Sequence, residues 1–182
     1  MPRAAARSRR IRDEPRPAAS PMIDVVPALD AEAIASAREL FREYAAALPV
    51  DLEYQGFAAE LENLPGAYRP PAGALLLARV DGALAGCVAM RPLDTQVAEM
   101  KRLYVRRLHR GAGVGPRLVE AAIAAASAGG YAALWLDTLA SMTAAQRLYQ
   151  RYGFRTIAPY GGQAAPGTRY YGLRLPAARE PA

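Results

Sequence analysis

Residues 97–128 decide the fold of this chain: VAEMKRLYV (97–105), RRLHRGAGVG (106–115) and PRLVEAAIAAASA (116–128). They read as a strand, a glycine-rich turn and a helix whose apolar residues, such as Leu118, Ala122 and Ala126, recur at helical spacing. A helix that begins directly on such a turn brings backbone N–H groups and the positive end of its dipole to one point. The stretch therefore predicts a site for a phosphate group.

The turn itself, RGAGVG (110–115), allows two interpretations. Glycines permit close approach to a ligand and Arg110 can add a charged group, but a tight strand-to-helix connection uses the same residues. No Gly-Lys-Ser/Thr follows and no Gly-x-Gly-x-x-Gly occurs, so the turn matches neither a P-loop nor a dinucleotide fingerprint. Pro116 fits the first helical turn, although it removes one potential phosphate donor.

The rest of the chain alternates strand-like and helix-like segments. Asp81-Gly82 between two apolar runs is a hairpin signal, and Asp30 is placed to cap a helix. Strand 97–105, helix 116–128 and strand 132–138 form a parallel crossover unit. We expect further strands at 23–27, 74–80, 84–90, 155–158 and 168–175, and further helices at 29–48, 55–64 and 141–152.

The N-terminal residues 1–21 differ from the rest. They hold six arginines against two acidic residues, so they carry +4 of the formal net charge of +6, and we expect a disordered tail. The segment is similar to an organellar transit peptide, or the chain is bacterial and starts at Met22. Residues 22–176 are expected to form one domain and 177–182 a second tail. Nucleic acid is not an expected partner, except through residues 1–21.

Composition excludes several classes of protein. With 52% hydrophobic residues and no apolar run of about 20, the chain is expected to be soluble, cytoplasmic and without a membrane partner. Cys87 lies in an apolar run and is interpreted as core packing rather than a nucleophile. One cysteine and one histidine predict no metal site, and we expect His109 to be exposed and not catalytic.

Two motifs together identify a family. The chain resembles the GNAT superfamily of acyl-CoA-dependent N-acyltransferases, whose turn Gln/Arg-x-x-Gly-x-Gly/Ala is matched by Arg110, Gly113 and Gly115. Residues 103–105 (LYV) are similar to its Leu-x-Val strand ending. Residues 145–154 (AQRLYQRYGF) are similar to its Ala-x-x-Leu-Tyr-x-x-x-Gly-Phe motif, and both motifs occur in the family's order and spacing.

The resemblance implies an α/β (α+β) fold with a mixed, mostly antiparallel sheet of six to seven strands and about four helices. Strands 97–105 and 132–138 would splay into a V-shaped gap for acetyl-CoA. Pantetheine would pair with the backbone around Leu103, Tyr104 and Val105. The residues expected to hold the pyrophosphate are Arg110, Gly111, Ala112, Gly113, Val114 and Gly115.

One departure from the family concerns the cofactor. Family members often have an Asn seven residues before the motif tyrosine, where its amide bonds the cofactor, and this chain has Met142 there. We count Met142 among the cofactor-binding residues. Ser141 or Thr143 could supply the missing hydrogen bond, and packing is the alternative role for Met142.

The implied chemistry is attack of a neutral amine on a thioester. Neutralising an alkylamine at pH 7 costs about 4.6 kcal/mol, so a base is useful. Glu99 stands six residues before Val105, where members with a glutamate base on this strand carry it; the alternative is a solvated or Lys101-paired residue. Tyr149 matches the tyrosine near the CoA sulfur, and we expect it to hydrogen-bond the thiolate; the alternative is core packing.

The expected function is transfer of an acetyl group from acetyl-CoA to a primary amine of a small molecule, amino acid or peptide, in a ternary complex. The alternatives are a non-catalytic acyl-CoA-binding regulatory module and a transferase that uses another acyl-CoA. The protein is expected to be a monomer or homodimer. The candidate acceptor-lining residues favour a small amphipathic amine or amino acid: Tyr44, Glu53, Tyr54, Phe57, Tyr160, Tyr170 and Tyr171.

Overall fold

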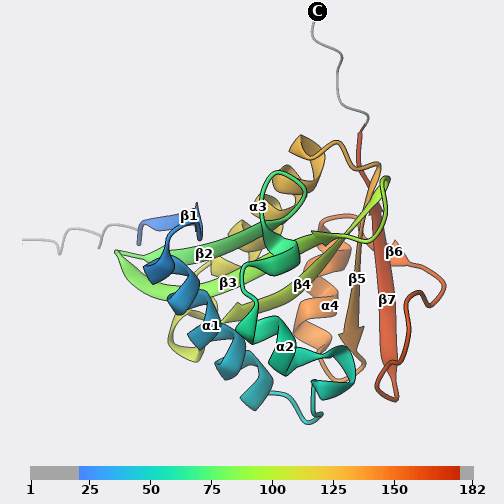
Figure 1. Cartoon of the computed structure of the whole chain (residues 1–182), viewed down its shortest axis with the longest axis horizontal. Coiled ribbons are helices and arrows are strands. Elements are labelled where there is room, and N and C mark those ends of the chain that lie inside the picture. Colours follow the sequence, from blue (N-terminus) through green and yellow to red (C-terminus); the bar gives the residue numbers. More distant parts are fainter. Residues whose placement is uncertain (1–20, 177–182) are drawn as a thin grey trace, which may run out of the picture.

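Seven strands form one sheet in the order β1-β2-β3-β4-β5-β7-β6 in the computed structural model, which describes residues 21–176 (Figure 1). Neighbouring strands are antiparallel except β4 and β5, which are parallel, so the expected mixed sheet is confirmed. The strands are β1 (Ile23–Pro27), β2 (Ala74–Val80), β3 (Ala83–Pro92), β4 (Val97–Val105), β5 (Ala133–Leu139), β6 (Arg155–Thr156) and β7 (Thr168–Arg174).

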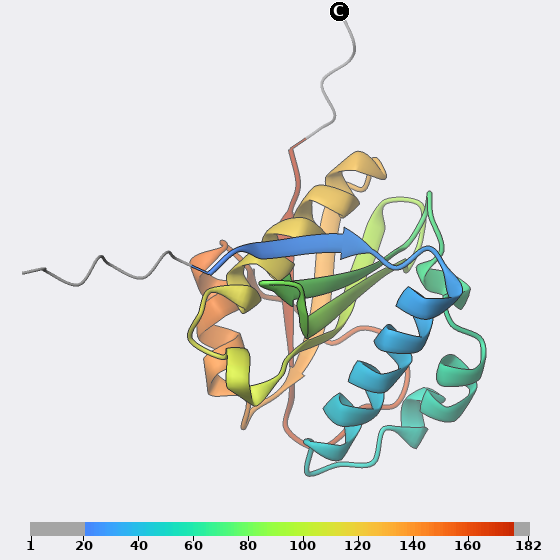
Figure 2. The same ribbon diagram turned by 90° about the vertical axis from the view of Figure 1, so that its left-hand side faces the viewer.

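Helices cover both faces of the sheet. Figure 2 shows α1 and α2 on one side and α3 and α4 on the other. Leu40 and Phe41 of α1 are fully buried in one apolar cluster, and Leu118 and Val119 of α3 in a second. The helices are α1 (Ala31–Ala46), α2 (Phe57–Glu62), α3 (Val114–Ala128) and α4 (Thr143–Arg151), with short 3-10 turns η1 (Glu53–Gln55), η2 (Gly66–Tyr68) and η3 (Arg107–His109).

Local sequence explains where the first helices begin and end. Asp30 caps α1 as expected, because its Oδ1 accepts a hydrogen bond from the Ala33 N–H at 2.8 Å. The helix expected over 55–64 is shorter and is preceded by η1. Gly56, with φ of 71°, separates the two, and a left-handed residue cannot continue a right-handed helix.

The gap between β4 and β5 is the feature that positions the site. Their parallel pairing covers only three residue pairs, from Val97↔Ala133 to Glu99↔Trp135, after which the strands diverge (Figure 1). The expected V-shaped splay is therefore present, with β5 one residue later than predicted. Beyond Glu99, no strand formed by residues 21–176 lies beside the edge of β4 that faces β5.

A bulge lies in β4 just beyond the splay point. Arg102 has a left-handed φ of 57°, and the β3–β4 register shifts between Cys87 and Ala89. The buried Arg102 guanidinium donates to both carboxylate oxygens of Glu60 and to Gln55 Oε1 at 3.0 Å. These bonds tie the α2 side of the molecule to the bulged strand and help to hold an unfavourable backbone conformation.

The predicted tails are residues 1–21 and 177–182, and apart from Pro21 they lie outside the described residues. Between residues 21 and 176, no helix combines the length and apolar character that a membrane crossing requires.

Candidate functional site

A groove of about 870 Å³ opens at the splay. The end of β4, the glycine turn and the start of α4 line it, and they contribute Leu103, Val105, Gly113 and Met142. Leu48 and Pro49, just beyond α1, close one side. Eight of the eleven predicted cofactor residues line this groove: Leu103, Tyr104, Val105, Arg110, Gly111, Gly113, Gly115 and Met142. Ala112 and Val114 do not line it, and the Val114 side chain is buried in the core, while Tyr149 lines a neighbouring cavity.

The glycine turn forms the outer end of the groove. Gly111 and Gly113 have φ of 82° and 92°, a region that glycine enters without strain. Helix α3 starts at Val114, two residues before the expected Pro116, so the N–H groups of Val114 and Gly115 belong to its open first turn. Backbone donors and the positive helix end thus meet at the turn, as the sequence predicts.

Arg110 takes a different direction from the one expected. Its Nε donates to the Val105 carbonyl at 3.1 Å, so part of the guanidinium folds back on the strand. His109, on η3, lines the groove and is half-buried instead of exposed.

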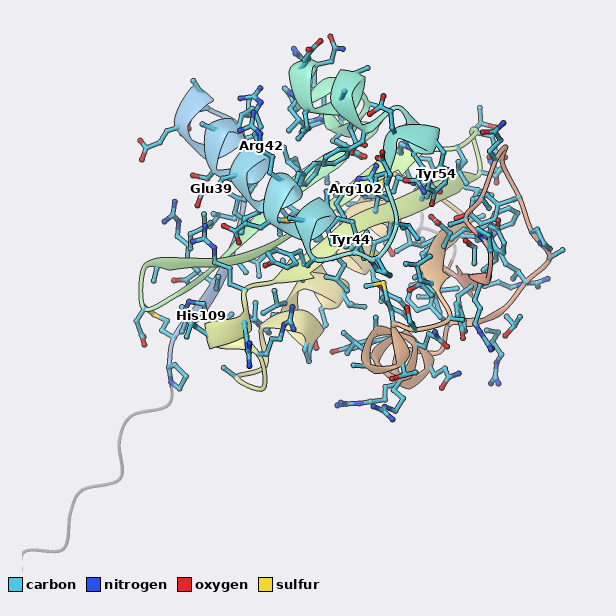
Figure 3. The ribbon with its side chains drawn as sticks, turned by 90° about the horizontal axis from the view of Figure 1, so that it is seen from below. Glu39, Arg42, Tyr44, Tyr54, Arg102 and His109 are labelled. Carbon is cyan, nitrogen blue, oxygen red and sulfur yellow. The ribbon has the colours of Figure 1, made fainter. Side chains whose placement is uncertain are left out.

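A narrow cavity of about 30 Å³ lies at the inner end of the groove. Tyr44, Tyr149 and Met142 line it, together with Arg102 and Tyr54, and Figure 3 shows Tyr44, Tyr54 and Arg102 near one another. Burial raises the pKa of Tyr44 to about 12 and moves that of Tyr149 still higher. Both phenols therefore keep their protons well above neutral pH and are available as hydrogen-bond donors.

The surroundings of Tyr149 bear on its two predicted roles. Only 5% of the residue is exposed, and its ring lies 5.8 Å from Phe154 and 6.4 Å from Tyr171, so it packs in the core. It also lines the narrow cavity. Met142 lies nearby as the first residue before α4, and its sulfur accepts a contact from Thr138 Oγ1 at 3.6 Å.

A third cavity, which we call the acceptor pocket because the predicted acceptor residues Tyr54, Tyr160 and Tyr170 line it, lies on the other side of the splay point and measures about 190 Å³. Glu99 lines it and is 4% exposed. Its Oε2 lies 2.8 Å from both Nε and Nη2 of Arg91, while its Oε1 accepts from the Tyr160 hydroxyl at 3.1 Å. Both oxygens of the predicted base are thus already engaged.

Lys101 links two carboxylates at this pocket. Its Nζ lies 3.8 Å from Glu99 Oε1 and 3.6 Å from Asp137 Oδ1. Lys101 and Asp137 each follow the last paired residues, Glu99 and Trp135, by two positions, so the ion pair spans the gap where backbone pairing stops. Burial lowers the pKa of Lys101, and the two carboxylates only partly oppose this shift.

Other predicted acceptor residues are placed differently. Tyr54, Tyr160 and Tyr170 line the acceptor pocket, and Tyr44 lines the narrow cavity. Glu53 is exposed and accepts a hydrogen bond from the Ala58 N–H, so it caps α2. Phe57 packs under the Arg102 guanidinium, and Tyr171 is 3% exposed in the core.

Three side chains at this site were not singled out from the sequence. Arg91 and Asp137 were not considered, and Lys101 was considered only as a partner of Glu99. A charged residue in the apolar strand AALWLDT (132–138) is the signal that could have found Asp137. Arg91 reaches the site because β3 extends to Pro92, beyond the expected 84–90, and pairs Arg91 directly with Glu99.

The three cavities follow one another through the sheet. The groove and the narrow cavity share Tyr44, Leu103 and Met142. The narrow cavity and the acceptor pocket share Lys101 and Asp137. A long ligand in the groove and a small one in the acceptor pocket would therefore meet beside these two charged side chains. Within residues 21–176, no cluster of three His, Cys, Asp or Glu side chains is arranged to hold a metal ion.

Known proteins resemble this chain in sequence and in fold. The model of the acetyltransferase (GNAT) family matches residues 35–154. An uncharacterised N-acetyltransferase of Schizosaccharomyces pombe is 39% identical over 138 residues, which cover 75% of this chain and 85% of that protein.

Two solved structures share the fold at low identity. A GNAT-family acetyltransferase of Staphylococcus aureus Mu50 has a TM-score of 0.69 at 20% identity, covering 85% of this chain and 100% of that one. A Salmonella typhimurium protein, solved with its cofactor acetyl-CoA, has a TM-score of 0.62 at 19% identity, covering 88% and 98%.

Proposed function

Because the chain belongs to the GNAT family of acetyltransferases, we propose that it moves the acetyl group of acetyl-CoA to a primary amine by direct attack in a ternary complex. The observation that carries this proposal is the passage from groove to narrow cavity to acceptor pocket. Two substrates can enter from opposite sides and meet at the splay. Residues 22–176 form the transferase domain in this proposal.

The groove is the place for acetyl-CoA. The glycine turn, residues 110–115, receives the pyrophosphate through backbone N–H groups and the start of α3. The unpaired edge of β4 at Leu103 and Val105 offers hydrogen bonds to pantetheine, and the Arg110 side chain leaves the Val105 carbonyl if that oxygen is used. The thioester then reaches the narrow cavity beside Tyr149.

Direct attack fits the chain better than an acyl-enzyme. Cys87, the single cysteine, is fully buried, and burial raises the pKa of its thiol, so it presents no thiolate to a thioester. In the proposed step, the acceptor ammonium first gives one proton to a carboxylate. The nitrogen then attacks the carbonyl carbon, the C–S bond breaks, the CoA thiolate takes up a proton, and the amide nitrogen loses its second proton.

Two carboxylates are available for the first proton. Glu99 remains the predicted proton acceptor, although Arg91, Tyr160 and Lys101 already contact its oxygens. Asp137 has 22% of its side chain exposed, and among residues 21–176 its single ion-pair partner is Lys101; it lines both the narrow cavity and the acceptor pocket. The geometry thus adds Asp137 as the more accessible candidate.

Tyr149 acts on the leaving group, the CoA thiolate, in this proposal. Its raised pKa makes full proton transfer to a thiolate unfavourable, so it stabilises the developing thiolate with a hydrogen bond.

The test is a binding and turnover assay. Calorimetric titration with acetyl-CoA measures binding, and release of CoA is followed with amines, amino acids and peptides. Saturable acetyl-CoA binding and amine-dependent CoA release are expected. A chain that fails to bind acetyl-CoA would overturn the proposal, and binding without release for any amine would favour the regulatory-module alternative.

A further inference from the structure

The walls of the acceptor pocket carry balanced charge. Arg91 and Lys101 are cationic, and Glu99 and Asp137 are anionic. They form a row of alternating sign in which each neighbouring pair lies between 2.8 and 3.8 Å apart. The row runs from Arg91, with 38% of its side chain exposed, through Glu99 and Lys101, with 5% and 6% exposed, to Asp137, with 22% exposed.

The two cations keep hydrogen-bond donors for a ligand. Lys101 Nζ is at ion-pair distance from its two carboxylates, 3.6 and 3.8 Å, which is longer than the 2.7–3.2 Å of an N–H···O bond. Its ammonium is thus a deeply buried donor group beside the cavity. Arg91 directs Nε and Nη2 to one oxygen of Glu99, and Nη1 carries two more N–H groups.

A simple ammonium fits this pocket poorly. Its positive charge would be attracted to Asp137 and Glu99. It has no negative charge and no hydrogen-bond acceptor, however, for Arg91 and Lys101. An acceptor that carries a carboxylate beside its amine satisfies both signs, and it adds no net charge to a largely buried cluster. A carboxylate also suits the guanidinium, which can bind it with paired hydrogen bonds.

We propose that the acceptor is an amino acid or a closely related amino carboxylate, an inference that rests on the proposed function. Arg91 and Lys101 bind its carboxylate, and Asp137 receives its ammonium group. At about 190 Å³, the pocket is smaller than the roughly 300–1,000 Å³ of drug-sized ligand sites, which fits an acceptor of this size.

The aromatic side chains define a subclass. The Tyr160 ring lies 5.3 Å from Tyr170, and both line the pocket together with Tyr54. Their faces favour an apolar or aromatic side chain on the acceptor.

Matched acceptors test the proposal directly. L-Phenylalanine, L-phenylalaninamide and 2-phenylethylamine share the ring and amine and differ in the carboxylate, and the same triplets are made for other amino acids. Rates are compared per unit of neutral amine, because the ammonium group of L-phenylalaninamide has a lower pKa than those of the other two compounds, so more of it is neutral at a given pH. We expect kcat/KM for the acid to exceed that of the other two by about tenfold or more.

Variants separate recognition from folding. Arg91→Met should raise KM for the acid more than KM for the amide or the amine, because only the acid loses a partner for its carboxylate, and Arg91→Lys should restore part of that difference. An effect through Glu99, which Arg91 also contacts, should change the rates of all three acceptors equally. Arg79→Met is the matched control, because within the described part of the chain the Arg79 guanidinium bonds only the Gly82 carbonyl in its hairpin.

Three results would overturn the carboxylate assignment: amides or amines that react as well as acids, equal losses for all three acceptors in Arg91→Met, or turnover confined to acceptors outside the panel. Each leaves acetyl-CoA binding intact, so none is confused with failure of the transferase proposal.

Discussion

The two sides of the splay offer different kinds of groups to a ligand. On the cofactor side, the groove presents backbone: two left-handed glycines, the first turn of α3 and the free edge of β4. On the acceptor side, the pocket presents side chains from β3, β4, β5 and the loop before β7. A backbone site survives many side-chain changes, whereas a side-chain site can be redesigned one residue at a time.

The buried ion pair between Glu60 and Arg102, which holds the bulge of β4, is expected to give the largest effect, on stability. Glu60→Gln removes the charge that partners the buried Arg102, which should cost about 3 kcal/mol of stability. Burial alone would raise the pKa of Glu60, but Arg102 lowers it overall. This stabilisation is therefore present above about pH 4.5 and is lost as the pH falls through the lowered pKa.

Urea unfolding of wild type and variant between pH 3 and 8 measures this difference. It should be large at pH 7 and shrink in acid. Glu39→Gln is the control, because Glu39 is 60% exposed and its pair with Arg106 should contribute less than about 1 kcal/mol. Equal losses in both variants would contradict a special role for the buried pair.

The acceptor-side carboxylates should give the next effect. Glu99→Gln and Asp137→Asn are each compared with wild type for turnover and for acetyl-CoA affinity. The one that takes the proton should lose about 100-fold in kcat, most strongly at low pH, where less amine is neutral, with the acetyl-CoA Kd near normal. If neither variant slows turnover between pH 6 and 9, the proton leaves by another route.

Tyr149→Phe tests the point where both sides meet. Removing the hydroxyl should lower kcat by about 20-fold, because one hydrogen bond to the thiolate is lost, while thermal stability stays close to wild type. Rapid CoA-release kinetics and a melting curve report the two quantities. Unchanged turnover would mean that Tyr149 serves only to pack against Phe154 and Tyr171.

Gly113→Ala should give the smallest effect, confined to the cofactor side. A side chain at φ of 92° is strained, so the turn should shift and weaken acetyl-CoA binding by about tenfold, with acceptor preference unchanged. Gly82→Ala places a similar strain, at φ of 83°, in a hairpin turn that does not line the groove. Both variants lose stability, but a weaker affinity in Gly82→Ala would refute the assignment of the turn.

The cofactor side could be predicted because the residues that form it lie close together in the sequence and make recognisable motifs. Glycine spacing, the helix pattern after it and the later Leu-Tyr and Gly-Phe pairs all lie within short segments. The strand 97–105 was predicted to the residue, and the splay followed from the family resemblance.

The acceptor side depends on long-range register, which single segments do not encode. Arg91 meets Glu99 only through the pairing of β3 with β4, and Lys101 meets Asp137 only through the parallel alignment of β4 with β5. Tyr160 reaches Glu99 from 61 residues away. Glu53 was predicted to line the site from its residue type and its place in the sequence, yet its carboxylate accepts a hydrogen bond from the Ala58 N–H at the start of α2.

The short pairing of β4 with β5 also affects how the empty protein exchanges its amide hydrogens. Strands in the middle of a sheet are normally its best-protected part. Here the amides of β4 that point toward β5 beyond Glu99 have no ladder partner among the described residues, although β4 lies fourth of seven in the sheet. Deuterium should therefore enter the centre of this sheet early, and a ligand that occupies the gap should slow its entry at Leu103 and Val105 more than anywhere else.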